Sequence, residues 1–234
     1  MKRMRLVLLC IVFLGVGVAF GQERTASPEG DFEVSLNTAL GGWIITGYTG
    51  AGGNVVIPSE IQSIPVRRIG REAFYFCSSL VSVVIPDGVT VIGAVAFWDC
   101  SNLVSVGIPE GVTAIGAGAF MECGSLASVV IPDSVTFIGE GAFAWCESLV
   151  SVAIPDRVRL IDVAAFYECR SLASVAISDS VTEIGDGAFR ECSSLVTVDI
   201  APINRRWGRD SFSGCKLSLA SQTALRRAGY MGRF

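Results

Sequence analysis

The sequence predicts a solenoid built from stacked, β-rich coils. Cysteine recurs at intervals of 23 residues without insertion or deletion, and phenylalanine recurs with it, three residues earlier. A fixed period of this length is typical of solenoids, because each coil can bury its apolar side only against the coils above and below it. The two series are Phe74, Phe97, Phe120, Phe143, Phe166, Phe189 and Phe212, and Cys77, Cys100, Cys123, Cys146, Cys169, Cys192 and Cys215.

Residues 1–21 are predicted to be a signal peptide. Three basic residues are followed by an apolar run, residues 6–20, that is too short to span a bilayer comfortably. Small residues at Ala19 and Gly21 fit a signal-peptidase site, so we expect cleavage after Gly21. Because no later stretch is long and apolar enough to cross a membrane, the mature chain is expected to be exported: periplasmic, on the outer surface, or secreted.

Residues 22–53 precede the repeat and are predicted to form an N-terminal β cap. The segments 32–36 and 42–47 alternate apolar and polar residues as short strands do, and glycine-rich turns flank the second segment. The open end of a solenoid exposes strand edges and apolar side chains, so a covering element is expected there.

Residues 54–215 are the predicted repeat region, with about six full coils and partial ends. Each regular coil has three pieces. The first, as in residues 80–85, reads Leu-x-x-Val-x-Ile and predicts a strand with inward-facing Val and Ile, which a proline often ends. The second, as in residues 89–93, is short, β-branched and closed by glycine. The third, as in residues 96–103, spaces its inward residues three apart and predicts a short helical or 3₁₀ segment.

Residues 216–234 are predicted to form a C-terminal helical cap. A helix is expected from Ser218 to Ala228. Arg226 and Arg227 suit the negative end of its dipole, and Gly229 is a common helix stop. The residues expected to face inward are Leu219, Thr223, Leu225 and Ala228.

Seven cysteines in an exported chain invite a disulfide interpretation. The geometry of a stack argues against it. Equivalent cysteines in neighbouring coils would lie about 4.8 Å apart with parallel side chains, whereas a disulfide needs Cβ atoms about 3.5–4.5 Å apart. An odd number also cannot pair completely. We therefore predict a column of buried, reduced thiols.

Charge and composition exclude several classes of function. Residues 70–200 carry 16 acidic and 5 basic residues, a net of −11, which argues against nucleic acid as the ligand. The 234-residue chain has no histidine, and it contains no phosphate loop or zinc spacing, so no catalytic, cofactor or metal site is predicted. Five acidic residues follow the first strands, and we interpret them as solvated turns rather than as a calcium site, because a straight row does not supply converging ligands. They are Asp87, Glu110, Asp133, Asp156 and Asp179.

The repeat resembles a known family. Residues 103–123, which read Leu-x-x-Val-x-Ile-Pro-x-x-Val-Thr-x-Ile-Gly-x-x-Ala-Phe-x-x-Cys, are similar to the 23-residue leucine-rich repeat of the BspA-like class found in treponemes. The likeness runs from Val55 to Cys215. It implies a right-handed leucine-rich-repeat solenoid with a parallel β-sheet on its concave face, and a protein of the exported or surface kind that contacts other proteins. Arg159, Asp162 and Ser178 depart from the pattern, and we expect less regular turns there.

Three groups of outward residues are candidate partner-binding surfaces. Small residues on the first strands would make either a flat platform for a partner or a sheet that simply tolerates crowding. They are Ser82, Ser105, Ser128, Ser151 and Ser174, with Val84 and Val130 beside them. Large side chains elsewhere would either anchor a partner or fold back over the core. They are Tyr75, Phe76, Trp98, Met121, Trp145 and Tyr167 on the third piece, and Val91, Phe137 and Leu160 on the second strand.

Together these observations predict a non-enzymatic protein–protein interaction module. The family resemblance suggests adhesion, with a host or neighbouring-cell surface protein as the partner. The alternative is a structural envelope protein that self-associates by packing like chains through the sheet or the apolar back.

Overall fold

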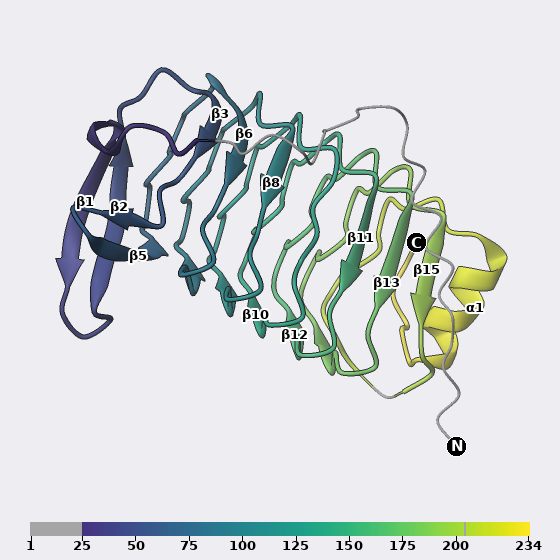
Figure 1. Ribbon diagram of the computed structural model, residues 1–234. Helices are drawn as coiled ribbons and strands as arrows, with labels where there is room; N and C mark the ends of the chain where they lie inside the picture. Colours follow the sequence, from purple (N-terminus) through teal and green to yellow (C-terminus); the bar gives the residue numbers. More distant parts are fainter. Residues whose placement is uncertain (1–24, 204) are drawn as a thin grey trace.

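The computed structural model describes residues 25–203 and 205–234, and shows a β-solenoid with a cap at each end (Figure 1). The predicted fold class is confirmed. The coils stack between an N-terminal hairpin and helix α1 (Leu219–Arg227) at the opposite end. The predicted signal peptide, residues 1–21, lies outside the described residues.

Two parallel sheets run along the solenoid, where one was expected. The first strands of the coils are β3 (Gly53–Val56), β6 (Leu80–Val84), β8 (Ser105–Gly107), β11 (Ser151–Ile154), β13 (Ser174–Ile177) and β15 (Thr197–Ile200). The second strands are β5 (Ile64–Ile69), β7 (Val91–Ile92), β9 (Ala114–Ile115), β10 (Phe137–Ile138), β12 (Leu160–Ile161), β14 (Glu183–Ile184) and β16 (Arg206–Trp207). The second set forms the longer, unbroken sheet.

Residues one period apart pair directly. Val83 lies opposite Val106, and Ile92 lies opposite Ile115. The register also holds where Arg159 and Asp162 depart from the repeat pattern, because Ile161 pairs with both Ile138 and Ile184. Equivalent letters of the repeat therefore lie directly above one another.

The first-strand sheet is interrupted once. Between β8 and β11 only an isolated bridge remains, from Ser105 to Ser128. The interruption lies beside Gly107, and a strand residue without a side chain weakens pairing. Val130, in the coil that lacks a first strand, is 79% exposed.

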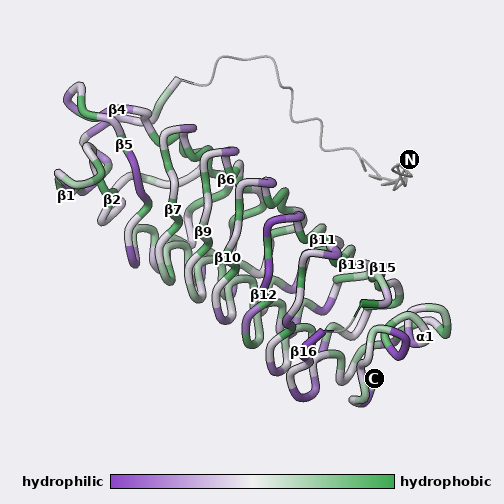
Figure 2. Tube along the Cα trace, turned by 90° about the horizontal axis from the view of Figure 1, so that it is seen from below, coloured by the Kyte–Doolittle hydropathy of each residue, from purple (hydrophilic) through white to green (hydrophobic). Residues whose placement is uncertain are grey.

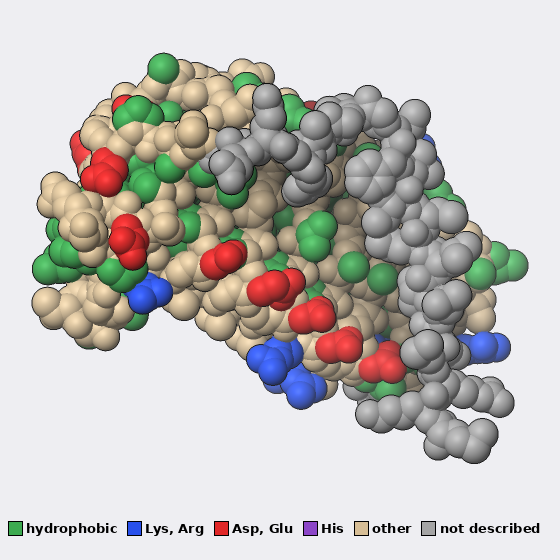
Figure 3. Space-filling model, in the orientation of Figure 1, with side chains coloured by type: hydrophobic (Ala, Val, Ile, Leu, Met, Phe, Trp, Pro, Cys, Tyr) green, Lys and Arg blue, Asp and Glu red, His purple; other side chains and the backbone are tan. Residues whose placement is uncertain are grey.

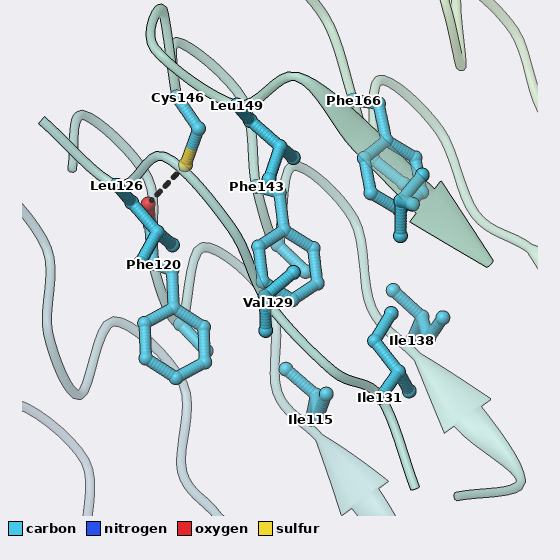
Figure 4. Packing of buried hydrophobic residues seen from close by; sticks show 14 of the residues in the cluster. Ile115, Phe120, Leu126, Val129, Ile131, Ile138, Phe143, Cys146, Leu149 and Phe166 are labelled. Carbon is cyan, nitrogen blue, oxygen red and sulfur yellow. Dashed lines mark hydrogen bonds between the residues drawn. The ribbon is translucent and has the colours of Figure 1, made fainter. Parts of the chain in front are cut away.

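The core is organised around the phenylalanine column. The seven rings have no exposed surface, and neighbouring rings stack with centroids 4.8–5.4 Å apart and planes within 2–13° of parallel. Figure 4 shows Phe120, Phe143 and Phe166 in this arrangement, surrounded by inward leucine, valine and isoleucine side chains. This separation lies within the range that favours aromatic pairs, so each ring stabilises the coil on either side.

The cysteines form a second column behind the rings. The thiol of Cys146 donates a hydrogen bond to the carbonyl oxygen of Phe120 in the preceding coil, at 3.2 Å (Figure 4). The same bond, at 3.1–3.2 Å, is made by Cys100, Cys123, Cys169, Cys192 and Cys215. These six thiols are buried and reduced, as predicted, whereas Cys77 in the first coil is only half-buried.

The third piece of each coil is a run of turns, so the expected helical or 3₁₀ segment is wrong. Turn bonds such as Cys100 N–H to Phe97 O are present, but two residues per coil have positive φ and interrupt any helix. The N–H of Phe97 instead donates to the carbonyl of Ala119 in the next coil. At the first positive-φ position Gly118, Gly141 and Gly187 suit the conformation, but Val95 occupies it at φ 49°. A β-branched residue is strained there.

The N-terminal cap is an antiparallel hairpin, and its two predicted strands are present. Strands β1 (Phe32–Asn37) and β2 (Gly42–Tyr48) pair with each other, and β2 continues parallel to β5. The Tyr48 ring stacks on Phe74 at 5.1 Å, so it closes the phenylalanine column. The short elements η1 (Glu29–Asp31) and β4 (Glu60–Ile61) complete this end.

The C-terminal cap is the predicted helix, with Ser218 as N-cap and two arginines in its last turn. Its predicted buried face is partly wrong, because Leu219 is 81% exposed and Thr223 is also exposed. Ser221 faces inward instead, because its hydroxyl accepts from Val198 N–H and donates to Val196 O. It thus satisfies backbone groups at the edge of β15, where a further strand would otherwise pair. Leu225 and Ala228 complete the buried face as predicted.

The stacked column predicts a large cost for removing one ring. Phe143→Ala should lower the free energy of unfolding by about 3–5 kcal/mol, because a buried aromatic leaves a cavity between two coils. Chemical denaturation would measure this, and hydrogen exchange should show faster opening near Phe120 and Phe166 than at either cap. Phe143→Leu, which keeps an apolar filler, should cost clearly less. Equal melting of the alanine variant and the parent would contradict the packing.

The positive-φ position in the turns predicts a stabilising substitution. Val95→Gly should raise the free energy of unfolding by about 0.5–1 kcal/mol, because relief of left-handed strain exceeds the greater entropy of glycine in the unfolded chain. The matched reverse change, Gly187→Val, should lower it by about 1–2 kcal/mol. Both are read from urea unfolding curves. A destabilised Val95→Gly variant would show that Val95 contributes packing that outweighs its strain.

Candidate interaction faces

Each coil has three sides, and the predicted partner-binding residues are distributed over all of them. The first strands, the second strands and the turns each form one side, repeated along the solenoid. The structure therefore does not gather the predicted residues into one site. It offers three separate faces, which differ in exposure and in charge.

The strand face is the outer side of the first strands. Val130 is its most exposed predicted residue at 79%, and Val84 is 37% exposed. A row of exposed valines that the sequence analysis did not single out runs beside them, at 42–51% exposure: Val81, Val104, Val150 and Val196. The sequence contains a signal for this row, which is the recurring pair Leu-Val at residues 80–81, 103–104, 149–150 and 195–196. The strand face is thus flat and largely apolar, although Ala127 and Ala173 replace the valine in two coils and Asp199 lies on the last strand.

The serines of this face differ in exposure, and the outward position predicted for the first of them, Ser82, is wrong. Ser82 is buried, with 8% of its surface exposed, because its hydroxyl donates to Asn54 Oδ1 at 2.7 Å under the irregular first coil. Ser105 and Ser174 are half-buried, whereas Ser128 and Ser151 are exposed. The outward serines therefore supply only scattered polar groups between the valines.

An acidic row borders the strand face, at the turns that end the first strands. It consists of Asp87, Glu110, Asp133, Asp156 and Asp179, all of them exposed. Figure 3 shows acidic side chains in an oblique line across this side of the molecule, and Figure 2 shows hydrophilic turns recurring coil after coil. In the described part of the chain, none of these five carboxylates forms an ion pair.

The turn face carries the larger aromatic side chains. Tyr75 packs edge-on against Phe76 and Trp98, with centroids 4.3 and 5.5 Å away, and Trp145 packs edge-on against Tyr167 at 5.1 Å. Phe76 is 57% and Tyr75 is 38% exposed. The other predicted residues of this face, Trp98, Met121, Trp145 and Tyr167, are half-buried. Several rings therefore lean on their neighbours, as the second interpretation of this group allowed.

Acidic groups on the turn face already have cationic partners. Arg170 bridges Glu147 and Glu168, and Arg190 lies beside Glu191. Partial burial would raise the pKa of the Glu168 carboxyl, but hydrogen bonds from Tyr167 and Arg170 outweigh it and hold that pKa below its usual value. The charge of this face is thus compensated at Glu147, Glu168 and Glu191, whereas Glu122 and Glu140 form no ion pair within the described residues.

The second-strand face is a narrower apolar stripe. Phe137 is 40% exposed, while Val91 and Leu160 are half-buried. Ala114 separates Val91 from Phe137 in the pairing. Leu160 is followed in register by Glu183, which forms an ion pair with Arg206 at 3.4 Å. Only one large side chain therefore protrudes from this stripe.

The thiols are poor candidates for nucleophiles. Burial raises the pKa of Cys77 from 9.0 to about 11, and raises the pKa values of Cys169 and Cys215 to about 12. A cysteine reacts as its thiolate, so these groups are almost entirely unreactive near neutral pH. Across residues 25–203 and 205–234, no three thiol or carboxylate groups come together to hold a metal ion. In the same residues, no helix has the length and apolar character needed to cross a membrane.

Comparison with known proteins identifies the repeat. The sequence matches the family described as BspA-type leucine-rich repeat region, in six copies, over residues 53–125 and 113–224. The crystal structure of a Treponema pallidum leucine-rich repeat protein is 36% identical, with a TM-score of 0.84, and the match covers 90% of this chain and 99% of that one. No protein of curated function matches.

Two further structures share the solenoid. A leucine-rich repeat protein from Bacteroides ovatus is 25% identical, with a TM-score of 0.61, over 84% of this chain and 58% of its own. One from Eubacterium ventriosum is 19% identical, with a TM-score of 0.55, over 73% of this chain and 61% of its own, and supports the fold alone.

The raised thiol pKa values predict alkaline destabilisation. Below about pH 9 the thiols are protonated in both states, and their contribution to stability is fully present. Between pH 9 and about 12 the unfolded thiols ionise while the folded ones stay protonated, so stability falls as pH rises. Urea unfolding of the parent and of Cys169→Ala should show a shallower fall for the variant, by about 1.4 kcal/mol per pH unit. Parallel curves would contradict a buried, neutral Cys169.

Proposed function

This chain belongs to the BspA-type leucine-rich repeat family, and from that premise we propose that it is an exported, non-enzymatic module that binds another protein through its strand face. The partner is a protein on a host or neighbouring cell, and the role is adhesion. The predicted signal peptide supports export. The lack of histidine and the raised thiol pKa values support a binding role over a catalytic one.

The observation that supports the strand face is its recurring apolar exposure. Monomeric soluble proteins seldom expose contiguous apolar area that serves no contact. Here an exposed valine protrudes in five of the six coils, and the coil at residues 172–177 presents Ala173 and Ala176 instead. Small neighbours such as Gly107 and Ala153 leave the face flat enough for another backbone to approach closely. The net charge of −11 over residues 70–200 favours a protein partner over nucleic acid.

Binding assays with matched variants would test this function. The mature chain is expected to bind saturably to one or more proteins in a panel of extracellular-matrix, serum and bacterial-surface proteins. Val130→Asp combined with Val150→Asp should weaken that binding at least about tenfold, because charged groups would then be desolvated in the contact. Both positions are exposed, so folding should be retained, and circular dichroism would check this.

The matched control lies on the turn face. Tyr75→Ala with Phe76→Gly removes comparable exposed apolar surface and should change binding by less than about twofold. The reverse pattern would move the contact to the turn face. Absence of saturable binding across the whole panel would contradict adhesion.

A further inference from the structure

Two parts of the chain carry opposite net charge. Residues 70–200 have a net charge of −11, whereas residues 201–234 carry 7 basic and 1 acidic residue, a net of +6. The acidic row lies on the first of these parts, beside the valines of the strand face, and its carboxylates form no ion pair within the described residues. Charge of this kind is available to a cationic partner.

The C-terminal cap presents the complementary surface. The outer side of α1 begins with Leu219, 81% exposed, and ends with the exposed Arg226 and Arg227. Met231, 85% exposed, follows the helix. Neither Arg226 nor Arg227 forms an ion pair in the described part of the chain. The guanidinium of Arg226 already donates to the carbonyl oxygen of Tyr230 and lies over the Phe234 ring, so Arg227 is the cation that is available to a partner. The outer side of this helix is therefore apolar at one end and cationic at the other.

We infer that the C-terminal cap of one copy docks on the strand face of a second copy. Leu219 then contacts the valines, and Arg227 at the end of α1 meets the acidic row. This inference rests on the proposal that the strand face binds protein, and it names a second copy of this chain as an occupant.

The spacing of the two surfaces supports this pairing. From Leu219 to Arg227 the helix rises by about 12 Å. From Val84 to Asp87 the extended chain advances by at most about 10 Å. A helix lying along the strand direction would therefore place its leucine over the valines when Arg227 reaches the carboxylates. Part of the turn face fits less well, because Arg170 and Arg190 already lie beside Glu147, Glu168 and Glu191.

Such a contact is heterologous, because the cap and the strand face are different surfaces. Each copy offers one of each, so association continues into short chains or closes into a ring. Attraction between exposed charges weakens with salt, so the assembly should be favoured at low ionic strength.

Sedimentation and light scattering of the mature chain would test the docking. At about 20 mM salt the mean mass should rise with protein concentration, and about 0.5 M salt should return the chain to monomer or weaken association at least tenfold. A cap variant, Leu219→Asp with Arg227→Gln, should be monomeric. So should a row variant, Glu110→Gln with Asp133→Asn. All four positions are exposed, so the fold should be retained.

Mixing the two variants gives the decisive result. Each is monomeric alone, but the intact cap of the row variant should dock on the intact face of the cap variant, giving a 1:1 heterodimer that grows no further. A control with Glu122→Gln and Glu140→Gln, which removes equal charge outside the acidic row, should assemble like the parent. Assembly by either variant alone, or no heterodimer on mixing, would overturn the inference.

The test also separates this inference from the proposed function. A parent chain that stays monomeric at low salt, yet captures a foreign protein through Val130 and Val150, would overturn self-docking and leave the adhesion proposal standing. Self-assembly without binding to any foreign protein would support self-docking and contradict the adhesion proposal.

Discussion

The structure depends on one constraint: every coil must repeat at the spacing of neighbouring β-strands, and every buried side chain must fill the gap at that same spacing. Strands repeat at about 4.8 Å. The stacked rings, 4.8–5.4 Å apart, satisfy the same repeat. The thiol column adds directional hydrogen bonds, because six of the seven thiols donate to a carbonyl oxygen of the coil before. Ring stacking, thiol bonding and strand pairing therefore all favour one register.

A stack of this kind must still be closed, and the two ends are closed differently. At the N-terminal end Tyr48 extends the ring column by one more aromatic, and strand β2 of the hairpin pairs with β5. At the C-terminal end no further strand pairs with β15 within the described residues, so Ser221 bonds the backbone groups of Val196 and Val198. Arg205 is buried there and donates to the carbonyl oxygens of Val181 and Ala201.

Sequence reasoning succeeded where a residue is defined by stacking and failed where it is not. Phe143 and Cys146 were predictable because only an identical neighbour fits above and below them. The turns were predicted wrongly because inward-facing residues three positions apart occur in turns with positive φ as well as in helices. Val95 has positive φ, but a valine gives no sign of this in the sequence, as a glycine would. The predictions for Ser82 and Leu219 were wrong because local contacts decide their burial. Ser82 bonds to Asn54, and Ser221 takes the inward position on the helix, and neither contact follows from the 23-residue period. The three faces could be predicted from the repeat. The sequence did not show which face exposes apolar side chains beside carboxylates that form no ion pair.

Variation among the repeats separates packing from contact. Inside, phenylalanine and cysteine are identical in every regular coil, as stacking requires. Outside, the row that begins at Val84 changes freely to Gly107, Ala153 and Asp199. The acidic row follows neither pattern: it is exposed, yet it keeps its charge in five successive coils. Like charges in neighbouring coils repel one another, although solvent weakens the repulsion because these carboxylates are exposed. Packing does not require that row, and folding gains nothing from its repulsion, but a docked cationic surface would relieve it. A binding role explains the row with fewer assumptions than solvation of the turns, which any polar residue would provide.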